Sequence, residues 1–244
     1  MPASPEILVY GAVVAFAAYL VFGLCGFGST LIAVPLLAHF FPLKFVIPVI
    51  VLVDCAASLH QGFRLRAGVN RRDMMPLLPF LAVGMVIGAF VLAWTPGTIL
   101  LPLLGVFVTA YGVHYALRYE SVYRLARWSA APIGLVAGTT SSVFGMGGPF
   151  YVMYLAGRGT PPEQVRATMP VIFVVTTIGR IALFALTGLI TREVLIAAAL
   201  FAPVMALGLW SGNRWHARFT RSDVVRAIGA VLALSGLSLL VRSL

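Results

Sequence analysis

The stretch Gly23-Leu-Cys-Gly26-Phe-Gly28-Ser29-Thr30 interrupts an apolar run near the start of the chain. A second break, Ser142-Val-Phe-Gly145-Met-Gly147-Gly148-Pro149, interrupts another apolar run about 120 residues later. Glycine permits sharp turns of the backbone. Inside a bilayer, such non-helical backbone is tolerated only where protein or a cavity surrounds it. The two breaks therefore predict helices that enter the membrane and stop or turn there.

The remainder of the chain has the composition of a membrane protein. Of its 244 residues, 61% are hydrophobic and 10% are charged. A soluble domain carries roughly 25% charged residues, so this chain has too few to cover a surface facing water. We expect an all-α polytopic membrane protein with ten helical pieces, at 7–22, 27–40, 44–63, 74–94, 98–117, 129–142, 149–157, 164–188, 194–212 and 223–241.

The positions of the glycines indicate an internal duplication. An offset of 119 places Gly26-Phe-Gly28 on Gly145-Met-Gly147, and an offset of 120 places Gly88 on Gly208. We expect an N-terminal repeat at 1–117, a cytoplasmic linker at 118–128 and a C-terminal repeat at 129–244.

The arginines predict that the two repeats are inverted. The connection 64–72 carries four arginines and its counterpart 188–193 carries one, whereas 94–98 carries none and its counterpart 212–222 carries three. Basic connections mark the cytoplasmic side, so equivalent connections should lie on opposite sides. Each repeat then holds a re-entrant pair of glycine-broken helices plus three transmembrane helices, and both termini are periplasmic. The arginines are explained as topology signals, so no nucleic-acid partner is expected.

The broken helices predict an anion site near the midplane of the membrane, because a helix N-terminus offers unpaired N–H groups and a positive dipole. Ser29 or Thr30 is expected to cap the first such helix, and Pro149 to begin the second. The alternative is that the glycines only permit close helix crossing. The candidate substrate-binding residues of the two breaks are Gly26, Gly28, Ser29, Thr30, Ser142, Gly145, Gly147 and Gly148.

Hydroxyl groups precede the second break in the run Thr139-Thr140-Ser141-Ser142. Their side chains either donate hydrogen bonds to a bound anion or satisfy carbonyls that the break leaves free. The sequence leaves these two roles open.

Arg180 lies within an apolar span, where a charge is costly and indicates function. A guanidinium binds a sulfonate or carboxylate through two parallel hydrogen bonds. His60 stands at the matching position of the first repeat, and we include it in the predicted site. The alternatives for Arg180 are a structural pair and a side chain that reaches the interface.

Asp54 is the one acidic residue deep within a predicted span, and it is our candidate for proton coupling. It lies six positions before His60, so both could line one helix face. A structural partner for an arginine and a cation ligand are the alternatives. The sequence shows no metal-ligand spacing or nucleophile motif, so we expect no metal, cofactor or enzymatic activity.

The first break resembles the signature of the TauE/SafE (TSUP) sulfite exporter family, in Gly26-Phe-Gly28-Ser29 and the following Leu-Ile-Ala-Val-Pro35-Leu-Leu. Gly145-Met-Gly147-Gly148-Pro149 is similar to the degenerate second copy of that family. The resemblance implies a secondary transporter of sulfite, a sulfonate or a sulfoacetate-like anion in the bacterial inner membrane, working by alternating access.

Other functions are open at this point. An anion channel and a transporter of small carboxylates are the nearest, followed by a membrane-embedded enzyme using Asp54 and His60 and by an anchoring subunit. The sequence leaves the anion, the direction of transport, the coupling ion and homodimer formation undetermined.

Overall fold

A computed structural model describes residues 5–117, 124–215 and 221–243 of the protein. Within these ranges the chain is helical and forms no strand, which confirms the predicted class. Residues 118–123 of the predicted linker lie outside the described residues.

Ten helices of nine or more residues occur in the described ranges, as the sequence predicts. The range of the predicted first repeat holds α1 (Pro5–Cys25), α2 (Ser29–Leu37), α3 (Leu43–Leu65), α5 (Leu78–Trp94) and α6 (Gly97–Leu117). The second holds α7 (Ala130–Phe144), α8 (Gly148–Gly157), α9 (Pro162–Leu186), α10 (Arg192–Trp215) and α11 (Arg221–Ser243). Three single turns were not predicted: α4 (Arg71–Met74) and the 3₁₀ turns Arg66–Gly68 and Arg127–Ser129.

Four of the described helical segments are long and apolar enough to cross a membrane. They are Glu6–Cys25, Leu43–Gly68, Pro162–Leu186 and Arg192–Trp215. Large apolar side chains are exposed on the outside of the bundle, for example Phe63, Trp94 and Leu186. In water such a surface would be unfavourable, whereas lipid solvates it.

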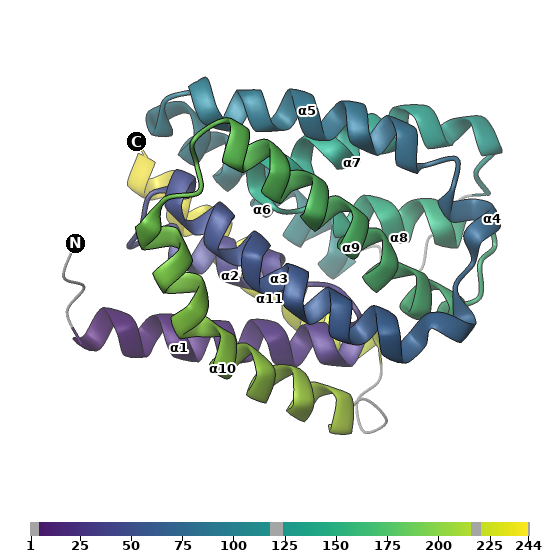
Figure 1. The fold of residues 1–244 in the computed structure, drawn as a ribbon, viewed down its shortest axis with the longest axis horizontal. Coiled ribbons are helices and arrows are strands. Elements are labelled where there is room, and N and C mark those ends of the chain that lie inside the picture. The colour runs from purple at the N-terminus through teal and green to yellow at the C-terminus, as the bar shows by residue number, and fades with distance from the viewer. Residues whose placement is uncertain (1–4, 118–123, 216–220, 244) are drawn as a thin grey trace.

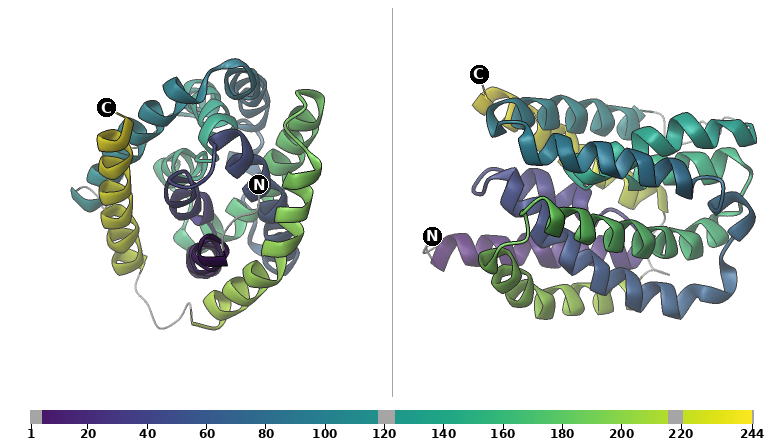
Figure 2. Two further views of the ribbon diagram at one scale, coloured as in Figure 1. Left: turned by 90° about the vertical axis from the view of Figure 1, so that its left-hand side faces the viewer. Right: turned by 45° about the horizontal axis from the view of Figure 1, so that its top comes forward.

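Helices of one repeat pack mainly against helices of the other (Figures 1 and 2). The pairs are α1 with α10, α5 with α7, α6 with α11 and α3 with α9. Helix α1 begins at the end of the bundle where α11 finishes, whereas α7 begins at the opposite end, near α4 (Figure 1). Helices α3 and α9 thus come together in the middle of the fold.

Glycines permit the close crossings of these pairs. A Cβ on Gly84 or Gly88 of α5 would meet the backbone of α7, and one on Gly208 or Gly212 of α10 would meet the backbone of α1. At these four positions glycine therefore serves to let two helices cross closely.

The same contacts bear on the predicted alignment of the repeats. Gly88 meets Thr139 and Ser142 of α7, and Gly212 meets Leu20 and Gly23 of α1, which lie 119 positions earlier in the chain. By these contacts Gly88 would correspond to Gly212, at an offset of 124 rather than the predicted 120. Because the breaks align at an offset of 119, five additional residues would separate α8 from α10, which a constant offset cannot accommodate.

Candidate functional site

Left-handed glycines produce the two breaks. Gly26 and Gly28 have φ angles of 81° and 107°, and Gly145 has a φ angle of 75°. Residues with a Cβ rarely adopt these angles. Gly145 ends α7 because its left-handed φ turns the chain out of the helix, while its N–H still donates to the Ser141 carbonyl at 2.9 Å.

Gly147 and Gly148 are required for a different reason. Gly147 has an ordinary φ of −77°, but a Cβ there would overlap the hydroxyl of Tyr151. A Cβ on Gly148 would lie 3.1 Å from the ring of Phe173. These two glycines make room for side chains at the start of α8, where Pro149 occupies the first turn as predicted.

The two breaks lie against each other in the centre of the bundle. A Cβ on Gly145 would be 3.1 Å from the Thr30 methyl group, and one on Gly148 would be 3.7 Å from Phe27. Segments more than 110 residues apart in the sequence thus form one region.

Asp54 of α3 is buried in this region and accepts two hydrogen bonds. Tyr19 of α1 donates to its Oδ1 at 2.9 Å, and Ser29 of α2 donates to the same oxygen at 2.8 Å. All three side chains are at most 2% exposed. Ser29 therefore does not cap α2 as predicted, because its hydroxyl is used by Asp54 and Gly28 occupies the cap position.

Arg180 of α9 is fully buried, which excludes a side chain reaching the interface. Its Nη1 donates to the Ser141 carbonyl at 2.7 Å, and its Nε donates to the Thr176 carbonyl at 3.4 Å. A cation at the C-terminus of α7 is stabilised by the helix dipole. Its charge also interacts with that of Asp54.

Arg180 retains an unused donor, since its Nη2 has no hydrogen-bond partner. The buried hydroxyls of Ser141, Ser142 and Tyr151 also lack partners. Tyr151 lies near Ser141 and Thr176, but in hydrogen-bond geometry with neither. Leaving such a group buried and unpaired costs about 1–3 kcal/mol, so these groups favour a polar ligand. Tyr151 interacts with both Ser141 and Arg180, and we call these three residues the donor cluster. Ser142 instead lies where α7 crosses Gly88 of α5.

The hydroxyl run before the second break divides between its two predicted roles. Thr139 donates to the carbonyls of Leu135 and Gly84, and Thr140 donates to those of Val136 and Ala137. The threonines thus satisfy backbone groups, whereas the hydroxyls of Ser141 and Ser142 form no hydrogen bond.

His60 does not join the donor cluster. Its side chain is exposed and lines a groove between α3 and α10. Asp54, in contrast, is held in the interior by Tyr19 and Ser29. The pairing of Asp54 with His60, on which a membrane enzyme would depend, is therefore not formed.

The sequence analysis missed three residues of this region. Tyr19 and Tyr151 lie in apolar runs and look like core aromatics, and only packing reveals their hydroxyls as interior polar groups. Arg166 near the start of α9 donates to the Gly23 carbonyl at 3.4 Å, close to the first break. Arg166 lies near the start of a predicted span, and nothing in the local sequence indicates that its side chain reaches the first break.

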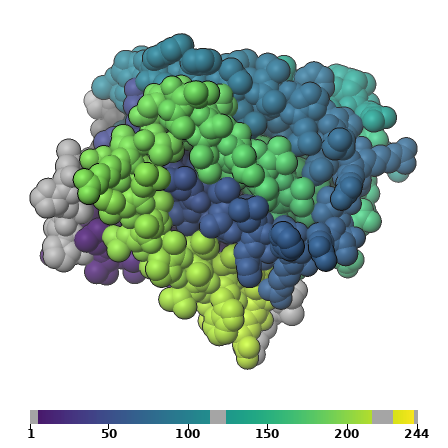
Figure 3. Space-filling model, viewed as in Figure 1, coloured from purple at the N-terminus to yellow at the C-terminus, as the bar shows by residue number. Residues whose placement is uncertain are grey.

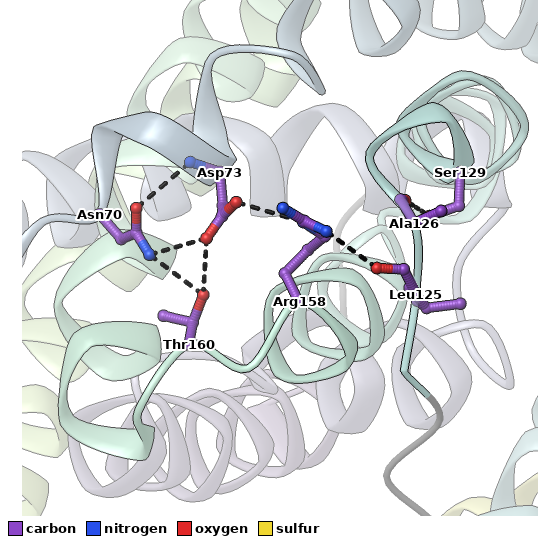
Figure 4. A network of polar contacts seen from close by, with 7 residues as sticks. All are labelled: Asn70, Asp73, Leu125, Ala126, Ser129, Arg158 and Thr160. Atoms are coloured by element: carbon purple, nitrogen blue, oxygen red, sulfur yellow. Dashed lines mark hydrogen bonds and ion pairs between the residues drawn. The ribbon is translucent and has the colours of Figure 1, made fainter.

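A second polar network connects the repeats at the end of the bundle near α4 (Figure 4). Asp73 accepts from Arg158 at 3.3 Å, from Asn70 at 2.9 Å and from Thr160 at 3.3 Å. Arg158 also donates to the Leu125 carbonyl at 3.0 Å. This network ties the α3–α5 connection to the α8–α9 turn and to the segment before α7.

Comparisons with known proteins identify relatives that are membrane transporters. The family model described as "Sulfite exporter TauE/SafE" matches residues 11–239. The chain is 33% identical over 195 residues to a probable inner membrane transporter protein TsaS of Comamonas testosteroni, covering 78% of this chain and 80% of that protein. It is 25% identical over 169 residues to a probable sulfite/organosulfonate exporter TauE of Cupriavidus necator, covering 69% of this chain and 66% of that protein. No solved structure matches the chain.

Proposed function

This chain belongs to the sulfite exporter TauE/SafE family, and we propose that it is a secondary transporter of a small sulfur-containing anion in the bacterial inner membrane. The observation that carries the proposal is the donor cluster, three buried residues with donors that lack partners, beside the second glycine break. A sulfite or sulfonate group offers three oxygens that accept hydrogen bonds. The description of the family and the name of the relative from Cupriavidus necator favour this class of substrate.

The anion would bind between Arg180 and the start of α8. Arg180 Nη2 would supply the charge, and Ser141 and Tyr151 would supply hydroxyl donors to the remaining oxygens. The N-terminus of α8, at Gly147 and Gly148, adds the positive end of a helix dipole. These groups come from α7, α8 and α9, so a movement between helices would change the affinity of the site.

Asp54 provides a route for coupling to protons. When ionised, it neutralises part of the charge of Arg180, with which it interacts. When protonated, it leaves Arg180 free to attract the anion. Tyr19 and Ser29 both donate to the same oxygen of Asp54 and would hold the ionised form in place.

Alternating access would arise from movement between inverted repeats. The support is that equivalent helix pairs, α1 with α10 and α7 with α5, cross through glycines at matching heights. Arg64 lies in the last turn of α3, and Arg71 and Arg72 begin α4, which lies at the end opposite to the start of α1 (Figure 1). Under the positive-inside rule that end is cytoplasmic, and both termini would be periplasmic.

The burial of the site favours a carrier over the rival anion channel. Asp54 and Arg180 are at most 2% exposed, and the Asp73 network links the α3–α5 connection to the α8–α9 turn at the predicted cytoplasmic end. A channel would need a continuous aqueous path to these groups in its conducting state. In a carrier, this arrangement would correspond to an occluded state.

The proposal is tested by substrate counterflow in proteoliposomes containing the purified protein. Vesicles would be loaded in turn with sulfite, thiosulfate, sulfoacetate, taurine or a simple carboxylate, and uptake of the same compound in labelled form would be followed. We expect saturable exchange with one or more sulfur anions and weak exchange with carboxylates. Exchange supported by carboxylates alone would overturn the substrate class, and flux that does not saturate would favour the channel.

A further inference from the structure

A groove of about 600 Å³ lies between α3 and α10, away from the donor cluster. Its lining includes His60 and Arg64 of α3 and Met205, Leu209, Trp210 and Arg214 of α10. Figure 3 shows this face of the molecule, with the surface of α3 lying beside that of α10. Asn213, which also lines the groove, exchanges two hydrogen bonds of 2.6 and 3.0 Å with Gln61, and these bonds join α3 to α10.

The groove is cationic at the end formed by the last turns of α3 and α10. Arg64 lies in the last turn of α3 and Arg214 in the last turn of α10, and both side chains are exposed. No acidic residue occurs among the described residues that line the groove. The two arginines therefore present uncompensated charge to whatever occupies it.

The groove lies at the level in the membrane where lipid headgroups meet the hydrocarbon chains. The guanidinium of Arg214 lies over the ring of Trp210, 5.8 Å from its centroid. Tryptophan and arginine at the ends of membrane helices mark the level of the lipid headgroups. The arginines of the α3–α4 connection place this end on the cytoplasmic side.

Further from these helix ends the groove is apolar. This combination of a charged and an apolar part indicates what kind of molecule binds there. Met205 and Leu209 line the apolar part, and the neighbouring outer surface presents Leu59, Phe63 and Leu207. A small free anion would gain nothing from these walls, whereas a molecule with an anionic head and an apolar tail would match both parts. Basic grooves between transmembrane helices on this side suit anionic lipid headgroups.

We propose that the α3–α10 groove binds one anionic phospholipid of the inner leaflet, with its phosphate between Arg64 and Arg214 and its acyl chains along Met205 and Leu209. The lipid would bridge α3, which carries Asp54, and α10, which packs on α1. The site is independent of the substrate proposal, because none of its residues belongs to the donor cluster.

The test is native mass spectrometry of the purified protein titrated with phosphatidylglycerol, with phosphatidylcholine as the neutral lipid. The double variant Arg64→Gln with Arg214→Gln should bind the first phosphatidylglycerol about 30-fold more weakly, at the usual contribution of an arginine near a lipid surface. The matched control is Arg71→Gln with Arg72→Gln, which removes the same charge from exposed positions at the same end outside the groove. We expect that control to bind as the unmodified protein does.

Equal weakening in both double variants would overturn the proposal, because it would indicate general attraction between charges. Unchanged binding in the groove variant would also overturn it. Displacement of the lipid by inorganic phosphate at millimolar concentration would identify a site for free anions instead. Lysine at both groove positions should restore most of the binding, since lysine keeps the charge at headgroup depth.

Discussion

Arg180 donates from Nη1 to the carbonyl of Ser141 at 2.7 Å, so a cation of α9 lies at the C-terminus of α7. The same carbonyl accepts the N–H of Gly145, which turns the chain at the second break. One side chain therefore both stabilises the break and presents Nη2 to the donor cluster. This double role explains why the membrane interior tolerates a charge here.

The first prediction concerns this double role. In Arg180→Lys the ammonium keeps the charge, but as a point donor it cannot reproduce the planar fork that reaches both Ser141 and a ligand. We expect substrate affinity to fall by about tenfold or more, the usual loss for one charge-assisted hydrogen bond. Isothermal titration with the anion identified by counterflow measures the change. A stable variant with unchanged affinity and transport would remove Arg180 from the site.

The second prediction separates two tyrosines of α8. Tyr151 and Tyr154 are both fully buried and both have hydroxyls without partners. Tyr151 adjoins Arg180, whereas Tyr154 adjoins Arg158 and Asp73. Tyr151→Phe should weaken anion binding by about five- to tenfold, because one donor to the ligand is lost. Tyr154→Phe, the matched control, should bind as before, and equal effects in both variants would contradict the assigned position of the anion.

The third prediction is a change in pH dependence. If protonation of Asp54 frees Arg180, the affinity for the anion should rise as the pH falls. A sulfonate is the appropriate probe, because it stays ionised throughout the range and only the protein titrates. Asp54→Asn mimics the protonated side chain and should bind tightly at every pH. Affinity that still follows pH in this variant would assign the coupling to another group.

The positions of the breaks could be predicted from sequence, but their partners could not. Glycine is locally required at Gly26, Gly28 and Gly145, because a left-handed φ excludes most other residues. The bond from Ser29 to Asp54 depends instead on how α2 packs against α3. Local capping rules predict that the Ser29 hydroxyl caps α2. In the folded protein it donates to Asp54 instead, because α2 packs against α3.

The apolar runs likewise predict where the helices lie in the sequence, but not which helices contact one another. His60 aligns with Arg180 at a constant offset, yet it faces the groove between α3 and α10 while Arg180 faces the interior. An alignment of repeats by spacing drifts when one repeat holds extra residues, as Gly88 and Gly212 demonstrate. Tyr151 carried no charge to distinguish it from the apolar side chains around it.

The fourth prediction concerns the crossing of α5 and α7. A methyl group at Gly84 would meet the Leu135 carbonyl and the Thr139 N–H, and both are backbone groups that cannot move aside. Gly84→Ala should therefore destabilise the protein by about 1–3 kcal/mol, the usual effect of overpacking. Gly97→Ala is the control, because nothing lies within 4 Å of a Cβ there. Thermal unfolding of the purified variants measures the difference, and equal Tm values would show that the crossing is looser than the structure indicates.

The last prediction tests whether the Asp73 network holds the cytoplasmic end closed. Arg158 contributes an ion pair that is only partly exposed, with the two side chains 24% and 12% accessible. Arg158→Gln should release the α8–α9 turn from the α3–α5 connection. Cys25, which is buried at the end of α1 beside Arg166, is a native reporter of that opening.

In a Cys55→Ser background, we expect a maleimide added from the cytoplasmic side to label Cys25 about two- to fivefold faster when Arg158 is glutamine. That range corresponds to the loss of a pair worth up to about 1 kcal/mol. Arg72→Gln removes a neighbouring charge that forms no ion pair among the described residues, and it should leave the rate unchanged. Equal rates in the Arg158 variant and its parent would mean that helix packing, not this network, closes the cytoplasmic end.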